Sequence, residues 1–103
     1  MDDKDMIIKS ARENAQKAPQ PNLAVNLRRL RKYVDLTQSE MASILFIDRT
    51  TYAYYEIGRS LPRTDTLIRI ACAFHISVDA LLGIRELPPA YREEDKWKAI
   101  AML

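Results

Sequence analysis

Two signals for the start of a helix stand close together in the middle of the chain. Thr37, followed three residues later by Glu40, has the pattern of a capping box, in which each side chain bonds the backbone N–H of the other residue. Asp48 is a second capping residue, and only residues 46–47 separate it from the first predicted helix. Gly58 then predicts the end of the second helix. The sequence therefore constrains this segment to two short helices joined by a tight turn.

Apolar residues at helical spacing predict further helices on both sides of this pair. One helix is expected over residues 22–34, with Asn22 as its N-cap. Another begins at about Asp65 and ends at His75, which we expect to be its C-cap, and Ser77 caps a short last helix. The sequence lacks the strict alternation of apolar and polar residues that strands show. We therefore expect an all-α fold, a compact domain of five helices with short terminal extensions.

Proline pairs and shifts in pattern divide the chain into three predicted parts. Residues 1–21 form an N-terminal extension, whose spacing of apolar residues predicts a modest helix over 3–16. Residues 22–84 form the helical domain, and residues 85–103 form a linker followed by an amphipathic C-terminal segment. In that last segment Trp97 and Ile100 fall on one side, so it either packs back on the domain or contacts a partner chain.

Composition excludes several classes of protein. The single cysteine, Cys72, excludes an intramolecular disulfide and a multi-cysteine zinc site, and we expect it to be a small core residue. No apolar run reaches the ~20 residues of a membrane span, and the acidic start MDDKDM is unlike a signal peptide, so a cytoplasmic protein is expected. The sequence contains no glycine-rich phosphate loop and no nucleophile beside a base. We expect no enzymatic activity, metal or cofactor.

The positive charge lies in the middle of the chain. The whole chain carries a net charge of +2, whereas residues 22–64 contain seven basic and four acidic side chains. Such an excess fits a polyanionic partner, although a solvated helix face is an equally common cause. For Arg28, Arg29 and Lys32 we expect the solvated face rather than a specific contact.

Residues 26–82 resemble the lambda-repressor and Cro type of helix-turn-helix, also called the xenobiotic-response-element family. Leu36-Thr37-Gln38-x-x-Met41-Ala42 matches the opening of the first motif helix, and Tyr55-Glu56-x-Gly58 with Pro62 matches the end of the second. The resemblance implies a transcriptional regulator, with repression as the expected outcome. Its recognition helix, about residues 49–57, would enter the major groove of double-stranded DNA.

The resemblance also implies roles for individual residues. Arginine pairs best with guanine, so Arg49 is the first candidate for reading sequence, although a solvated side chain is the competing interpretation. Tyr52 and Tyr55 are expected in the core. The implied base contacts are Arg49, Thr50 and Tyr54; the implied phosphate contacts are Gln38, Thr51, Arg59 and Arg63; Arg31 and Glu56 match a structural salt bridge.

Departures from the family pattern leave a second function open. Phe46 stands where glycine is common, and Ile57 stands where a polar residue is usual, so both would place apolar surface beside the DNA-facing side. A protein partner could bind there. The alternative function is an antitoxin, or another interaction module of the same fold, that binds a toxin or antagonist through the terminal extensions. A homodimer on two half-sites is also expected, with Trp97 and Ile100 as a self-association surface.

Overall fold

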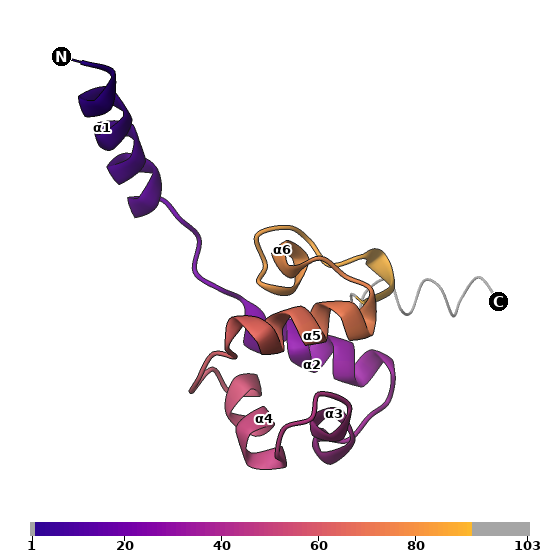
Figure 1. Cartoon of the computed structure of the whole chain (residues 1–103). Coiled ribbons are helices and arrows are strands. Elements are labelled where there is room, and N and C mark those ends of the chain that lie inside the picture. The colour runs from indigo at the N-terminus through magenta and orange to yellow at the C-terminus, as the bar shows by residue number, and fades with distance from the viewer. Residues whose placement is uncertain (1, 92–103) are drawn as a thin grey trace.

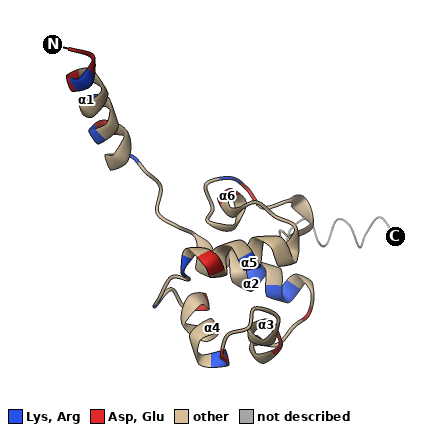
Figure 2. Cartoon of the chain, viewed as in Figure 1, with Lys and Arg blue, Asp and Glu red and all other residues tan. Residues whose placement is uncertain are grey.

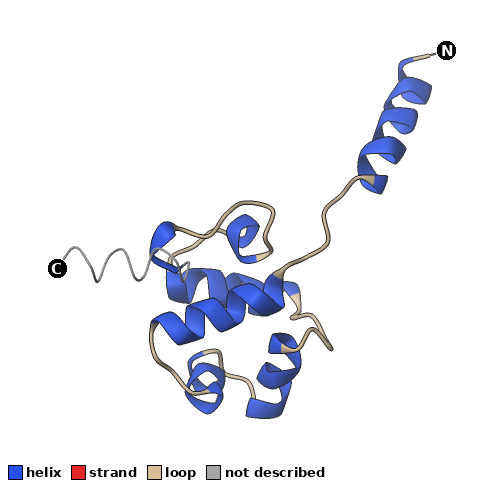
Figure 3. Cartoon of the chain, turned by 180° about the vertical axis from the view of Figure 1, so that it is seen from behind, coloured by secondary structure: helices blue, strands red, loops and turns tan. Residues whose placement is uncertain are grey.

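The computed structural model describes residues 2–91, and the regular structure in that range is entirely helical (Figures 1 and 3). Five helices, α2 to α6, form the domain expected from the sequence, and α1 precedes them. A short 3-10 helix, η1, follows. The elements are α1 (Asp3–Gln16), α2 (Leu23–Tyr33), α3 (Gln38–Ile44), α4 (Arg49–Glu56), α5 (Thr64–Phe74), α6 (Val78–Leu81) and η1 (Pro89–Tyr91).

Local hydrogen bonds start three of the domain helices as the sequence predicts. The capping box before α3 is complete: the Glu40 N–H donates to Thr37 Oγ1 at 3.1 Å, and the Thr37 N–H donates to Glu40 Oε1 at 3.0 Å. Asp48 accepts from the N–H of Thr51 at 2.8 Å, and the Ser77 hydroxyl accepts the equivalent bond at the start of α6.

Asn22 is the N-cap residue of α2 as expected, but the side-chain hydrogen bond that usually goes with this position is missing. Its backbone lies at φ −110° and ψ 38°, not in the extended conformation of the other caps, and its side chain makes no capping bond. The backbone N–H of Asn22 donates instead to the carbonyl of Leu82 at 2.8 Å. This bond and the close approach of Gly83, where an added Cβ would lie 2.7 Å from the Cβ of Asn22, hold the start of α2 against the end of α6.

Helix α2 lies at the centre of the core: it buries Leu23, Asn26, Leu27 and Leu30 along one face and contacts α4, α6 and η1. Tyr52 is fully buried and Tyr55 nearly so, as expected. Each large apolar side chain buried in this way contributes about 1.5–3 kcal/mol to folding. The largest fully buried apolar side chains are those of Leu23, Leu27, Leu30, Met41, Leu45, Tyr52, Ile70 and Leu81.

Cys72 is exposed, so its assignment to the core is wrong. The buried face of α5 consists of Thr66, Ile70, Ala71 and Phe74. Cys72 follows Ala71 by one residue, which is about 100° around the helix, and this rotation carries it off the buried face. The surrounding sequence is apolar and therefore suggested a buried position for Cys72. Apolar neighbours are a poor guide here, because α5 also exposes apolar residues such as Ile68.

Left-handed backbone conformations end several of the helices. His75 follows α5 at φ +53°, which confirms it as the C-cap. Phe46, between α3 and α4, has φ +59°. Residues other than glycine, asparagine and aspartate rarely adopt this conformation, which explains why glycine is common at this turn.

The two terminal segments behave differently within the described residues. Figure 1 shows α1 standing away from the other helices, and none of its side chains is buried. Residues 85–91, by contrast, are more than a linker, because Leu87 is buried and the Tyr91 hydroxyl donates to the carbonyl of Phe74 at 3.1 Å. The Tyr91 ring also meets Tyr33 edge-on, at 4.9 Å between centroids. Trp97 and Ile100 lie outside the described residues.

Candidate nucleic-acid interface

Helices α3 and α4 lie side by side at one end of the domain, opposite α6 (Figures 1 and 3). Helix α4 buries Tyr52, Tyr55 and Glu56 against the rest of the domain. Its other face remains at the surface, where the side chains of Arg49, Thr50 and Tyr54 are exposed. A helix held by one face and free on the other can enter a DNA major groove, which is about 12 Å wide.

The start of α4 carries two charges of opposite sign, which Figure 2 shows as a red and a blue segment side by side. Asp48 is engaged in capping: besides the Thr51 N–H, it accepts the Thr51 hydroxyl at 2.8 Å. The Thr51 N–H holds the pKa of Asp48 below its usual range, so this carboxylate stays charged. Thr51 is half-buried, and its hydroxyl proton is already used within the helix start. Arg49, the neighbour of Asp48, also has an exposed side chain.

The residues implied as phosphate contacts flank α4 on both sides. Gln38 is the first residue of α3 and is half-buried. Arg59 is exposed just after α4, and its guanidinium lies over the ring of Tyr54 at 4.7 Å from the centroid. Such a cation–π contact contributes about 0.5–1 kcal/mol at an exposed site and orients both side chains. Arg63 is also exposed, and its Nε lies 3.9 Å from Asp65 Oδ1.

An ion pair between Arg31 and Glu56 joins α2 to the end of α4. Arg31 Nε donates to Glu56 Oε2 at 2.6 Å, and Arg31 Nη2 donates to Glu56 Oε1 at 3.0 Å. This two-bond geometry is the strongest that a guanidinium and a carboxylate form. Arg31 Nη1 also donates to the carbonyl of Leu36 at 3.0 Å, which ties the turn before α3 to the same side chain. Arg31 therefore connects the end of α4 to α2 and to the turn before α3.

Burial of Glu56 is the largest single effect on its pKa and disfavours the charged form. The hydrogen bonds and the positive charge of Arg31, together with smaller contributions from neighbouring side chains, outweigh the burial and hold the pKa of Glu56 below its usual range. Because this pKa is lower in the folded chain than the ~4.3 of an unfolded glutamate, the stabilisation is complete at neutral pH. It is lost as the pH falls from about 5 through the folded pKa.

We expect urea unfolding midpoints to fall as the pH is lowered over this range. The decline should be shallower in Glu56→Gln, and equal slopes for the two proteins would contradict the assignment.

Two arginines bond the last carbonyls of α3 and α4, a role that the sequence did not predict for either of them. Arg28, expected on a solvated face, is half-buried and donates to the backbone carbonyl of Glu56 at the end of α4. Arg69 of α5 donates to the carbonyl of Leu45 at the end of α3 at 2.8 Å. Cations at helix C-termini satisfy the last carbonyls and complement the helix dipole. For Arg28 the expectation is therefore corrected, whereas Arg29 is exposed as expected.

Two apolar side chains lie at the edges of this surface. Phe46 is 83% exposed in the turn before α4, and Ile57 is 67% exposed directly after it. Arg69 lies 5.8 Å from the centroid of the Phe46 ring, so the ring is partly held in place. Within residues 2–91 no three histidine, cysteine, aspartate or glutamate side chains come together in a way that could hold a metal ion. No helix in the same range is long and apolar enough to cross a membrane.

Comparison with known proteins gives matches to the same part of the chain. The model of the family described as helix-turn-helix matches residues 27–81. The cryptic phage CTXphi transcriptional repressor RstR of Vibrio cholerae is 43% identical over 53 residues, which are 52% of this chain and 47% of that protein. The uncharacterized HTH-type transcriptional regulator YqaE of Bacillus subtilis is 38% identical over 71 residues, 69% of this chain and 61% of that one.

A solved structure extends the likeness to the fold. The crystal structure of a transcriptional regulator from Listeria innocua superposes with a TM-score of 0.62 at 33% identity and covers 82% of this chain and 78% of that one. The chain matches about half to three-fifths of the length of the two relatives above.

Proposed function

Because the chain belongs to the helix-turn-helix family, whose model matches residues 27–81, we propose that it binds double-stranded DNA sequence-specifically through α4. The observation that carries the proposal is the division of α4 into two faces. Tyr52, Tyr55 and Glu56 fix one face to the core, while the opposite face is free to meet base edges. The proteins of this family are non-enzymatic regulators, so the proposal includes no catalytic step.

In this proposal the exposed face of α4 reads the bases. Arg49 stands in the first turn of α4 with an exposed side chain, as the bidentate contact to the O6 and N7 atoms of guanine requires. Thr50 and Tyr54 meet the neighbouring bases. The phosphate backbone is held on either side of the groove by Gln38, Arg59 and Arg63, and phosphate contacts of this kind set the register without reading sequence. Thr51 would join them by exchanging the hydroxyl bond to Asp48 for one to a phosphate oxygen.

We further propose that the chain represses transcription as a homodimer. The likeness to a relative named as a transcriptional repressor supports repression. A dimer is supported by the size of the reading element, because the eight residues of α4 span only about 12 Å and contact few base pairs. Two copies on half-sites about one DNA turn apart would read enough sequence for a specific operator.

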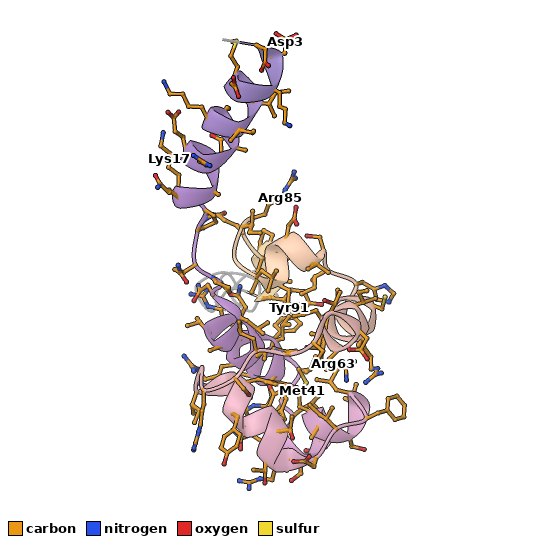
Figure 4. The ribbon with its side chains drawn as sticks, turned by 60° about the vertical axis from the view of Figure 1, so that its left-hand side comes forward. Asp3, Lys17, Met41, Arg63, Arg85 and Tyr91 are labelled. Atoms are coloured by element: carbon orange, nitrogen blue, oxygen red, sulfur yellow. The ribbon has the colours of Figure 1, made fainter. Side chains whose placement is uncertain are left out.

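The test is a fluorescence-anisotropy titration against the DNA immediately upstream of the protein's own gene, with scrambled DNA as competitor and several salt concentrations. Arg49→Ala should weaken specific binding by about 1–3 kcal/mol, or about 5- to 150-fold, and relax discrimination between the two DNAs. The matched control is Arg85→Ala. Figure 4 labels Arg85 at the α6 end of the domain, away from Met41 of α3, so its removal should leave specific binding unchanged.

Either outcome is informative. Tight binding that resists competitor, decreases steeply with salt and is lost in Arg49→Ala would establish a regulator that reads sequence. Weak binding that is equal for both DNAs and indifferent to Arg49 would overturn the proposal. It would favour the alternative, a protein of the same fold that binds a toxin or antagonist through its terminal extensions.

A further inference from the structure

Helix α1 has an apolar stripe that no other described residue covers. The helix has 14 residues, and none of its side chains is buried. Met6 and Ile7 are more than half exposed. A helix of this length is marginally stable in water by itself, so packing on a partner would stabilise it. The stripe lines one shallow surface hollow, formed by Met6, Ile7, Ser10, Ala11 and Asn14.

Opposite charges stand at the two ends of this stripe. Asp3 precedes Ser10 by seven residues, and Lys17 follows Ser10 by seven. Seven residues are close to two helical turns, so Asp3 and Lys17 lie nearly in line with Ser10. Figure 4 labels them at opposite ends of α1. Ser10 is therefore the midpoint both of the two charges and of the apolar hollow.

We propose that α1 is a dimerisation helix that pairs antiparallel with α1 of a second copy of this chain, with the two-fold axis passing beside Ser10. In this arrangement Asp3 lies opposite the partner's Lys17 at both ends, and Met6 lies beside the partner's Asn14. A parallel pair would place Asp3 beside the partner's Asp3 and Lys17 beside the partner's Lys17, which is repulsive at both ends. The placement of Asp3 and Lys17 therefore favours the antiparallel orientation. The small side chains of Ser10 and Ala11 allow the two helices to approach closely at the centre.

The antiparallel pair also fits the spacing of two DNA half-sites. This agreement rests on the proposed function, namely DNA binding by α4. The ends of the two α1 helices that lead to the domains lie about 21 Å apart, the length of a 14-residue helix. Residues 17–22 then connect each α1 to its α2, and six residues reach at most about 21 Å. The two domains can therefore sit about 34 Å apart, one turn of DNA. Two such short helices bury less than the ~1,600 Å² of a standard interface, so we expect a weak dimer that DNA strengthens.

The first test is disulfide cross-linking of the full-length chain. The exposed Cys72 is first replaced by Ser, and Ser10→Cys is then compared with Arg12→Cys under mild oxidation. Arg12 is two residues from Ser10, about 200° around the helix, and so faces away from the partner. We expect Ser10→Cys to form covalent dimers about tenfold faster, because a disulfide requires its two Cβ atoms to be close. Equal rates for the two variants would overturn the proposal.

The second test is a charge swap in the Ser10→Cys background. Asp3→Lys or Lys17→Asp alone places like charges opposite each other twice per dimer and should slow cross-linking about three- to tenfold. The double variant restores opposite charges and should recover the original rate. The recovery cannot come from a more stable α1, because the double variant places both charges unfavourably for the helix dipole.

Cross-linking that is indifferent to the single reversals would also overturn the proposal. Both tests are made without DNA, and binding of the same variants to a single half-site is measured separately. Failure of the α1 pair is thereby distinguished from failure of DNA binding.

Discussion

Replacing Glu56 with alanine is expected to lower the free energy of unfolding by about 3–5 kcal/mol. The Glu56 side chain is 3% exposed and the Arg31 side chain is 18% exposed, so the variant leaves a guanidinium charge largely buried without its carboxylate. Removing one partner of a buried pair costs more than the pair itself contributes, because the remaining charge has lost both water and its counter-ion. Small domains have total stabilities of about 5–15 kcal/mol, so much of this domain's stability would be lost.

The measurement is urea unfolding followed by far-ultraviolet circular dichroism at neutral pH. The matched control is Arg85→Ala, which breaks the exposed pair between Arg85 Nε and Asp79 Oδ2, 3.5 Å apart. Solvent screens this pair, so its loss should cost less than about 1 kcal/mol. If Glu56→Ala costs no more free energy of unfolding than the control, the pair between α2 and α4 does not hold α4 in place.

Asn26→Ala is expected to destabilise the domain by about 2–4 kcal/mol. Asn26 is 3% exposed, and its Nδ2 donates to the carbonyls of Ala80 at 3.1 Å and Leu81 at 3.0 Å. Alanine would leave the buried carbonyl oxygen of Leu81 without a donor, at a cost of about 1–3 kcal/mol. It would also remove one of two donors to the carbonyl of Ala80, which keeps the N–H of Gly83 at 3.1 Å. The attachment of α6 to α2 would weaken, although both helices would keep their own backbone hydrogen bonds.

Two measurements test this expectation. Urea unfolding gives the overall loss in the free energy of unfolding. Amide hydrogen exchange should be accelerated, relative to the unsubstituted protein, more in α6 than in α3 and α4. Asn14→Ala is the matched control, because Asn14 is an exposed asparagine of α1 whose side chain donates to the Ser10 hydroxyl at 3.5 Å. Similar losses of stability for the two variants would contradict a specific role for Asn26.

Much of the secondary structure follows from short-range chemistry that can be read in the sequence. Thr37, Glu40 and Asp48 bond backbone groups within three residues of themselves, so the starts of α3 and α4 depend on little else. The capping box and the C-cap at His75 are confirmed for this reason. The family and the all-α fold also follow from the sequence. The DNA contacts assigned to individual residues stay predictions, and Arg49→Ala is the first variant to test them.

The sequence by itself determined the local features, namely the order of the domain helices, most of their caps and the two-faced character of α4. Only the tertiary structure decided which polar side chains serve the interior. Asn26 contacts carbonyls 54 and 55 residues away, and the partner of Arg28 is 28 residues away. Cys72 is exposed although its neighbours are apolar. Spacing along a chain predicts which residues share a helix face, but not which face another helix will cover. That choice depends on how the helices pack.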